Sequence, residues 1–499
     1  MTNPEVPTLL RPPRPRDRPA WLSPRVLRTE VLAGLVVALA LIPEAISFSI
    51  IAGVDPRVGL FASFTMAVSI AFLGGRPAMI SAATGAVALV VAPLVREHGL
   101  QHLIATVLLA GVLQIALGLL GVARLMRFIP RSVMVGFVNA LAILILTAQL
   151  PYLRDVPWTV YAMVAAGIAI MVFLPKLTTV VPAPLVAIVL LTGVTVLAGL
   201  VLPDVADQGE LPDSLPVLVW PDVPLTLDTL SIIAPYAVGV ALVGLMESLM
   251  TAKLVDDITD TRSSGTREAW GQGAANVITG FFGGMGGCAM IGQTMINVRS
   301  GARTRLSTFL AGTFLLVLVV GLGDVVGTIP MAALVAVMVM VCVGTFDWHS
   351  VRPATLRRMP RSETAVMLST VAVTVWTHNL AYGVITGVLV AALLFARRVA
   401  HLVEVTSAVD AAGVKTYAVT GSLFFASSND LVHRFDHAGD PEHVVIDLSG
   451  AHVWDASTVA ALDAITTKYA ARGKDVRIEG LNAASAERYD RLAGHLPTH

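Results

Sequence analysis

The chain has 499 residues, of which 55% are hydrophobic and only 14% are charged. Soluble proteins carry about 25% charged residues, so this composition excludes an ordinary soluble fold, and the formal net charge of zero offers no basic surface for nucleic acid. The two cysteines, Cys288 and Cys342, lie in apolar runs, which argues against a disulfide framework, a metal site or another cofactor. The composition therefore indicates a polytopic α-helical membrane protein.

The N-terminal residues 1–28 are rich in proline and arginine. They lack the short apolar core and small-residue cleavage site of a signal peptide, so we predict a basic cytoplasmic segment. Residues 29–403 are predicted to form the membrane domain, because long apolar runs dominate them.

A helix needs about 20 apolar residues to cross the hydrocarbon core of a bilayer. On this criterion we predict fourteen spans in two sets of seven. The first set lies near residues 30–52, 58–74, 80–95, 101–122, 131–150, 157–174 and 182–202. The second set lies near residues 229–254, 268–282, 288–298, 305–323, 329–345, 363–378 and 381–400.

The charges of the connecting loops predict the orientation of these spans. Short cytoplasmic loops carry an excess of Lys and Arg, and such residues alternate along the chain, for example at Arg124, Arg127 and Arg131. The segment 203–228 holds six acidic residues and no Lys or Arg. We therefore expect residues 203–228 to be external and both termini to be cytoplasmic.

Two pairs of landmarks suggest that the chain contains an inverted repeat, with halves over about 29–203 and 229–403. Ile129–Pro130 opens the fifth span and Ile329–Pro330 opens the twelfth, 200 residues later. Glu44 lies in the first span and Glu247 in the eighth, 203 residues later. Seven spans followed by seven give the two halves opposite orientations in the membrane.

The third and tenth spans, 80–95 and 288–298, are short and dense in small residues. Paired short segments at equivalent positions of two repeats point to a transporter's binding site. If each is an extended piece followed by a half-helix, two positive helix ends face each other and form an anion site. The alternative is that the small residues only let helices pack closely.

Glu44 and Glu247 lie inside apolar runs. A charge at the bilayer centre costs about 2.5–3.5 kcal/mol on insertion scales, so such residues usually face the protein interior and serve a function. We expect Glu247 at the substrate site. The alternative for both is a neutral carboxyl that only bonds the backbone, and Pro43 makes this alternative stronger for Glu44.

Three stretches resemble the SulP (sulfate-permease-like) family of anion transporters. Residues 42–61 look like the family pattern P-Q-x-x-A-Y-A-x-x-A-G-x-P-P-x-x-G-L-Y, residues 129–137 look like I-P-x-x-V-x-x-G-F, and residues 294–304 resemble the region around the family's tenth helix. The resemblance implies a core domain (spans 1–4 and 8–11) and a gate domain (spans 5–7 and 12–14).

The resemblance also implies a set of substrate-binding residues, and three of its positions depart from the family. The implied set is Glu44, Phe48, Thr84, Gly85, Ala86, Glu247, Ala289, Met290, Ile291 and Gln293. Glu44 stands where the family usually has Gln, Gln293 where many members have Arg, and Ala83–Thr84 where Gly-Pro is usual. The site has thus lost a fixed positive charge and gained an ionisable acid.

The C-terminal residues 410–499 are predicted to form a small α/β domain. Residues 415–420, 443–448 and 475–480 read as strands, and 427–438 and 457–472 as helices. Residues 421–425, 445–449 and 455–457 look like the STAS (sulfate transporter and anti-sigma-antagonist) domain. Ala456 replaces the serine that bacterial regulators of this type phosphorylate, so we expect a regulatory or partner-docking domain without that switch.

The leading hypothesis is a secondary-active anion transporter that works by alternating access, coupled to protons, with Glu247 the first proton carrier and Glu44 the second. The resemblance implies an inorganic anion or small dicarboxylate as substrate, a homodimer, and a bacterial inner membrane. The alternatives are a uracil- or xanthine-type permease of the same fold and an anion channel, exchanger or voltage-driven motor. An enzyme is not expected, because the sequence shows no nucleophile–base pair.

Overall fold

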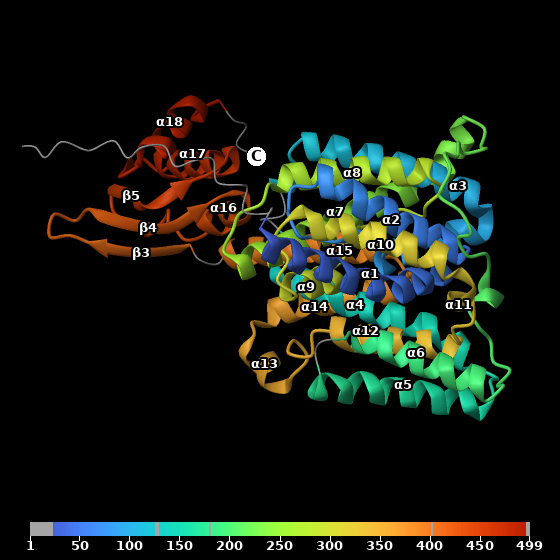
Figure 1. Ribbon diagram of the computed structural model, residues 1–499. Helices are drawn as coiled ribbons and strands as arrows, with labels where there is room; N and C mark the ends of the chain where they lie inside the picture. The colour runs from blue at the N-terminus through green and yellow to red at the C-terminus, as the bar shows by residue number, and fades with distance from the viewer. Residues whose placement is uncertain (1–22, 125–128, 179–180, 401–402, 496–499) are drawn as a thin grey trace, which may run out of the picture. The chain divides into compact units, whose positions relative to one another are not determined.

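Long apolar helices build the larger part of the chain (Figure 1). The structure is a computed structural model that describes residues 23–124, 129–178, 181–400 and 403–495. Most of the predicted N-terminal basic segment, and Arg127, lie outside the described residues. The chain divides into two units, residues 1–387 and 388–499, and each is described here by itself.

Helices occur where spans were predicted, and seven of those described are long and apolar enough to cross a membrane. The first set comprises α1 (Pro24–Ala52), α2 (Pro56–Leu73), α3 (Gly85–Leu119), α4 (Arg131–Gln149), α5 (Trp158–Leu177) and α6 (Ala183–Leu197). The second set comprises α7 (Leu227–Thr259), α8 (Gly265–Phe281), α9 (Ile291–Arg299), α10 (Arg305–Gly321), α12 (Met331–Thr345), α14 (Arg361–Thr377) and α15 (Leu380–Ala400).

The predicted third and fourth spans lie together within α3, where they meet at Gly99. This residue has a φ of 77° and a ψ of −174°, a backbone conformation that glycine adopts without steric cost. Short elements that were not predicted connect the long helices: η3 (Leu150–Leu153), η4 (Ala206–Gln208), α11 (Gly323–Gly327) and α13 (Pro353–Arg358).

The helices of the first unit pack into the two predicted groups. In the core domain, α3 packs against α7 and α8, and α10 packs against α1 and α2. In the gate domain, α4 packs against α12 and α14, and α5 packs against α6 and α12. Figure 1 shows α5, α6 and α12 side by side at one edge of the bundle and α3 and α8 at the opposite edge.

The landmarks of the inverted repeat keep equivalent places in the structure. Pro130 is the extended N-cap residue of α4, and Pro330 is the extended N-cap residue of α12. Proline suits these positions because a residue at a helix start needs no N–H for an intrahelical bond. The fold is therefore the expected seven-plus-seven inverted repeat.

Two buried carboxylates tie distant parts of the core domain together. Glu30 in α1 accepts a hydrogen bond from the backbone N–H of Thr304 at 2.9 Å, just before α10. Glu268 in α8 accepts hydrogen bonds from the N–H groups of Gly75 at 2.7 Å and Arg76 at 3.0 Å, just before the third span. Because charged acceptors make strong hydrogen bonds, these contacts favour a core that moves as one body.

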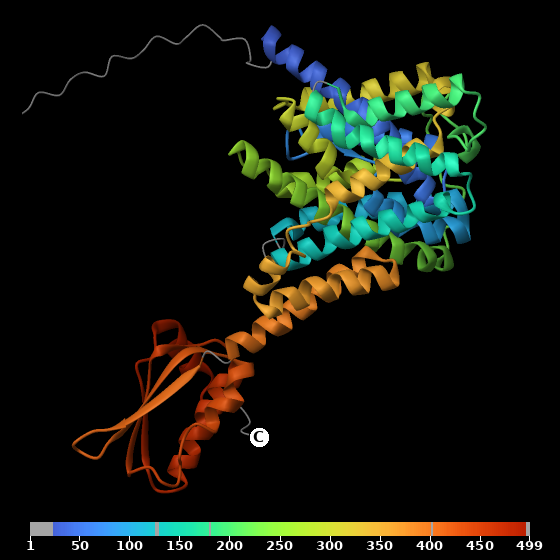
Figure 2. The same ribbon diagram turned by 90° about the horizontal axis from the view of Figure 1, so that it is seen from below.

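The second unit contains a four-stranded sheet of order β3-β4-β5-β6. Its strands are β3 (Glu404–Val409), β4 (Lys415–Leu423), β5 (His443–Val453) and β6 (Asp475–Glu479), and its helices are α16 (Phe425–Val432), α17 (Ala456–Ala470) and α18 (Ala483–Leu492). β3 runs antiparallel to β4, whereas β4, β5 and β6 are parallel. In Figure 2 the strands form one layer, against which the red helices lie.

The predictions for this unit missed β3 and α18 and made one helix too long. The helix expected over 427–438 begins at Phe425 and ends at Val432. Beyond it, the N–H of Asp436 donates to the Tyr417 hydroxyl at 3.3 Å, and the Asp436 carboxylate accepts from the N–H of Gly439 at 2.9 Å. These side-chain contacts satisfy the backbone in a turn instead of a helix.

A buried aspartate organises the polar part of this unit's core. The Asp440 carboxylate accepts hydrogen bonds from Lys415 Nζ at 2.6 Å, from the Tyr417 hydroxyl at 2.8 Å and from the Tyr469 hydroxyl. Burial alone would raise the pKa of Asp440, but these donors outweigh it and hold the pKa below its ordinary value. The hydrogen bond to Asp440 in turn raises the pKa of Lys415.

Candidate functional site

The two short, glycine-rich segments cross each other inside the core domain as a pair of extended strands. β1 (Ser81–Ala82) pairs antiparallel with β2 (Cys288–Ala289), with Ser81 opposite Ala289 and Ala82 opposite Cys288. A Cβ atom on Gly287 would overlap the carbonyl oxygen of Ala82. Glycine is thus needed where the two backbones approach most closely.

A helix follows each strand, as the sequence predicts. α3 begins at Gly85, and the Thr84 hydroxyl caps it by accepting a hydrogen bond from the N–H of Val87 at 3.3 Å. α9 begins at Ile291 after Met290, whose side chain makes no capping hydrogen bond. The first N–H groups of α9 therefore have no capping side chain at Met290, and both helix starts present partial positive charge.

A cavity of about 300 Å³ lies at these two helix starts, between the core and gate domains. The core domain contributes Glu44, Phe48, Thr84, Gly85, Glu247, Met290, Ile291 and Gly292 to its lining. The gate domain contributes Phe137, Val138, Leu141, Ile145, Val341, Gly344 and Thr345. The core side thus carries the charged groups, whereas the gate side is apolar except for Thr345.

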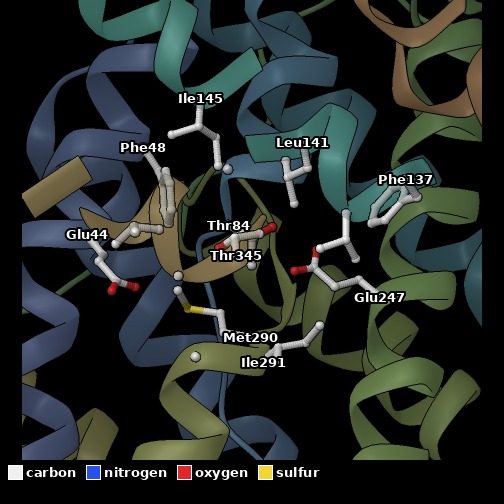
Figure 3. Close-up of a pocket in the computed structure, with 15 residues that line it drawn as sticks. Glu44, Phe48, Thr84, Phe137, Leu141, Ile145, Glu247, Met290, Ile291 and Thr345 are labelled. Atoms are coloured by element: carbon white, nitrogen blue, oxygen red, sulfur yellow. The ribbon is translucent and has the colours of Figure 1, made fainter. Parts of the chain in front are cut away.

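Two carboxylic acids line the cavity. Figure 3 shows Glu44 and Glu247 at opposite ends of it, with Thr84 between them. Glu247 is buried and Glu44 is half-buried. The described lining residues include no Lys, Arg or His, so the positive potential here comes from the helix starts alone.

Each acid has a polar side chain beside its carboxylate. The Cys288 thiol donates to Glu247 Oε2 at 3.0 Å, and the same sulfur lies 3.2 Å from the Thr84 hydroxyl. The Gln293 side chain lies next to the Glu44 carboxylate. Cys288 thus contacts both Glu247 on α7 and Thr84, the N-cap residue of α3. The protonation state of Glu247 is therefore connected to the start of α3.

Seven of the ten residues expected at the site line the cavity. Ala86, Ala289 and Gln293 do not. Ala86 and Ala289 are fully buried behind the lining, and Gln293 is 1% exposed, with its Oε1 atom unpaired. Gln293 therefore meets the cavity through Glu44, and the substrate-binding role of all ten residues stays a prediction.

The sequence reasoning missed the wall that the gate domain contributes. Residues such as Phe137 and Leu141 on α4 and Val341 on α12 are apolar residues in apolar helices. Nothing in their chemistry separates them from residues that pack against lipid. The signal that existed was the repeat itself, because Ile129–Pro130 and Ile329–Pro330 place α4 and α12 at equivalent positions.

Comparison with known proteins adds an independent line of evidence. Residues 27–166 and 155–370 match the protein family described as the sulfate permease family, and residues 406–494 match the STAS domain. The chain is 52% identical over 467 residues to a Bacillus subtilis (strain 168) protein named "Putative sulfate transporter YbaR", covering 94% of this chain and 97% of that protein. It is 26% identical over 522 residues to the bicarbonate transporter BicA of Picosynechococcus, covering 94% and 91% of the two chains.

Solved structures also resemble the chain, and two of them are described here. The transmembrane domain of a cyanobacterial BicA superposes with a TM-score of 0.65 at 26% identity, covering 73% of this chain and 98% of that domain. Murine Slc26a9 superposes with a TM-score of 0.82 at 17% identity, covering 95% and 89% of the chains. The second likeness concerns the fold alone.

Proposed function

Because the chain belongs to the sulfate permease family of anion transporters, we propose that it carries a small anion together with protons through the cavity between α3 and α9. The relatives are transporters and not enzymes, and the family match speaks against a uracil- or xanthine-type permease. The observation that carries the proposal is the pair of carboxylic acids, Glu44 and Glu247, in a cavity whose described lining has no cation.

The charge balance of the cavity supports proton coupling. Two helix starts supply about one positive charge in total, which leaves a doubly charged anion half compensated. Ionised Glu44 and Glu247 would repel the same anion, and burial already disfavours their charged forms. A proton on Glu247 removes one negative charge when the anion binds, so anion and proton cross together, with Glu44 as the second carrier.

The ionisable groups of the cavity lie on the core domain and the gate domain is nearly apolar, which supports alternating access. The two acids and both helix starts belong to the core domain, whose parts are tied together by Glu30 and Glu268. The gate domain presents a nearly apolar wall. An apolar wall makes no strong directional bonds, so the core can move past it without breaking hydrogen bonds to the substrate.

The names of the relatives suggest the first substrates to test. YbaR is named as a sulfate transporter and BicA as a bicarbonate transporter, so sulfate and bicarbonate come first and a small dicarboxylate such as fumarate second. Ligand pockets of about 300–1,000 Å³ are typical, and this cavity lies at the small end of that range.

The proposal extends to the setting of the transporter. We place it in the inner membrane of a bacterium, with both termini cytoplasmic, and we expect a homodimer. The STAS domain would then face the cytoplasm, where it could dock a regulatory partner. The exposed aromatic side chains Phe425 and Trp454 are candidates for that contact.

Uptake into proteoliposomes tests the proposal. Labelled sulfate, bicarbonate and fumarate are offered with and without an inward proton gradient, and the gradient should drive accumulation of at least one. Glu247→Gln keeps the shape and hydrogen bonding of the side chain and should abolish gradient-driven accumulation, whereas anion binding survives. Asp257→Asn, at an exposed carboxylate of the same helix α7 outside the cavity lining, serves as the matched control and should keep its coupling to protons.

Three outcomes of this assay contradict the proposal. Unsaturable uptake that ignores the proton gradient indicates a channel. Uptake that requires a second anion on the opposite side indicates an exchanger. Gradient-driven accumulation by Glu247→Gln with unchanged pH dependence shows that Glu247 does not carry the coupled proton and that its role is structural.

A further inference from the structure

A second cavity, of about 670 Å³, lies between the core and gate domains and has no residue in common with the first. Its core side is formed by Ile50, Ile51, Ala52, Gly53, Leu89, Ala92, Pro93 and Arg96, and its gate side by Leu144, Thr147, Ala148, Pro151, Tyr152 and His378. Leu144 lines this cavity and its neighbour Ile145 lines the first. The two cavities thus follow one another along α4.

The electrostatics of this cavity are the reverse of those in the first one. Its described lining contains Arg96 and His378 and no Asp or Glu. One group that can donate a hydrogen bond to an anion stands on each side, since the Arg96 guanidinium belongs to α3 and the His378 imidazole follows α14. An anion held between them would contact both domains.

Arg96 is available to a ligand. Its Nε atom donates to the Ala92 carbonyl at 3.3 Å, and its two terminal nitrogens have no hydrogen bond or ion pair with the part of the chain that the structure describes. The side chain is exposed. By contrast, Arg57 near the same end of α1 is committed to ion pairs with Glu210 and Asp55.

The backbone at His378 gives a second, independent observation. His378 ends α14 with a φ of 51° and a ψ of 27°, the left-handed conformation in which glycine is the usual residue at helix ends. A side chain at this position costs free energy relative to glycine. The imidazole nevertheless lines the cavity, as expected where a strained residue serves a function.

We propose that the second cavity is an antechamber that binds a small inorganic or carboxylate anion between Arg96 and His378 on its way to the first cavity. This inference rests on the proposed transport function and adds a binding site to it. The acidic segment 203–228 contacts this end of the core, where the N–H of Glu210 donates to Asp55. A cationic antechamber offsets the repulsion of an approaching anion by those acids.

The competing explanation for Arg96 is local. The first half of α3 ends at Gly99, and a cation in the last turn of a helix interacts favourably with its negative end. That role predicts a loss of stability in Arg96→Gln and no anion bound at Arg96, so a test must measure the potential of the cavity together with its protection by an added anion.

Charge-selective labelling of a cysteine in the cavity measures this potential. Thr147 is exposed and lines the cavity, and the native Cys288 and Cys342 are buried, so Thr147→Cys provides one reactive thiol. The protein in lipid nanodiscs, where both faces are accessible, is treated with a sulfonate-bearing methanethiosulfonate and, separately, with its trimethylammonium analogue. The ratio of the two rates reports the local potential and requires no transport.

In the Thr147→Cys background, Arg96→Gln should lower the anionic-to-cationic rate ratio by about tenfold, because the two reagents differ by two charges. Arg96→Lys should keep the ratio near its starting value. Glu97→Gln, at the next residue but outside the described lining, is the matched control and should not lower the ratio. Millimolar sulfate should slow labelling when Arg96 is present and have no effect in Arg96→Gln.

An unchanged ratio in Arg96→Gln overturns the antechamber, and so does an equal loss in Glu97→Gln or labelling that sulfate does not slow when Arg96 is present. A melting temperature measured on each variant separates misfolding from charge, and Arg96→Lys keeps the test decisive if Arg96→Gln unfolds. If no tested anion is transported but the ratio falls and sulfate slows labelling as expected, the antechamber stands and the proposed substrates fail. If transport is proton-coupled but the ratio is unchanged, only the antechamber fails.

Discussion

Gly85 allows the core domain to lie directly against the gate domain, which makes Gly85→Ala an informative substitution. Gly85 is the first residue of α3 and lines the first cavity. A Cβ atom there would lie 2.8 Å from Ile145 Cδ1 of the gate and 2.9 Å from Phe48 Cε1 of the core. The backbone of Gly85 does not have a positive φ, so alanine introduces no backbone strain and its effect comes from the new methyl group.

The size of the effect follows from these distances. Carbon atoms pack best at about 3.5–4.0 Å, so the Ile145 and Phe48 side chains, or the two domains that carry them, must shift by several tenths of an ångström to accept the methyl group. Adding a methyl group to a well-packed contact costs about 1–3 kcal/mol, which corresponds to about 5–150-fold in an equilibrium. Every conformation in which the two domains touch at this point becomes less favourable, and we expect the maximal uptake rate to fall about tenfold.

The assay is the maximal rate and KM of anion uptake in proteoliposomes, with the melting temperature of each purified variant. Gly292→Ala is the matched control, because Gly292 lies in the first turn of α9 and lines the same cavity, yet a Cβ there meets nothing within 4 Å. It should alter KM and leave the maximal rate nearly unchanged. The reasoning is refuted if Gly85→Ala transports at the wild-type rate, or if Gly292→Ala loses as much.

Three further predictions concern other parts of the chain. Asp440→Ala should destabilise the STAS domain by about 3–5 kcal/mol, as expected for breaking a buried pair. Thermal melts of the wild type and the variant measure this difference. The difference should disappear as the pH falls through the lowered folded-state pKa of Asp440. The Asp440 carboxylate contributes fully to the stability of the domain above its unfolded-state pKa. The pKa of Lys415 is raised, so the stability that Lys415 contributes is lost only as the pH rises through its folded-state pKa. An impermeant thiol reagent added outside cells should label a cysteine at position 213 but not one at 357; the opposite pattern would reverse the topology. Deleting residues 410–499 should leave anion binding intact, and complete loss of binding in a folded truncation would contradict the placement of the site in the membrane domain.

The elements that could be predicted from the sequence are those that depend on the composition of a single stretch of chain. Apolar runs of the right length marked the helices, and loops rich in Arg or Asp marked the turns between them. The glycines around residues 283–287 pointed to an extended piece before a half-helix, and the structure adds that the backbone there lies against Ala82 at Gly287. The elements that were missed, β3 and α18, are short. β3 is mostly exposed, and α18 is amphipathic but polar on average, so neither forms an apolar run.

The candidate site was accessible from sequence only where its residues were chemically unusual. Glu44 and Glu247 stand out in apolar helices, whereas Thr84 and Met290 were expected only because the family resemblance implied them. Phe137 and Leu141 could not be recognised from the sequence, because they line the cavity only on account of the position of α4, and their side chains are ordinary apolar ones. The antechamber was not predicted for a similar reason, because the helix ends that form its walls are distant from one another in the sequence.

The crossing of β1 and β2 has a consequence for how the chain is made. The N–H of Ile80 donates to the hydroxyl of Thr294, which lies 214 residues later, so the first extended segment is synthesised long before its partner. At about 5–20 residues per second, the delay is on the order of 10–40 s. During that time the backbone around residues 80–84 lacks its partners, and each unsatisfied polar group in a bilayer costs several kcal/mol. The nascent first repeat should therefore stay with the insertion machinery until the second repeat arrives, and a chain that stops after α6 should be degraded before it is stably inserted.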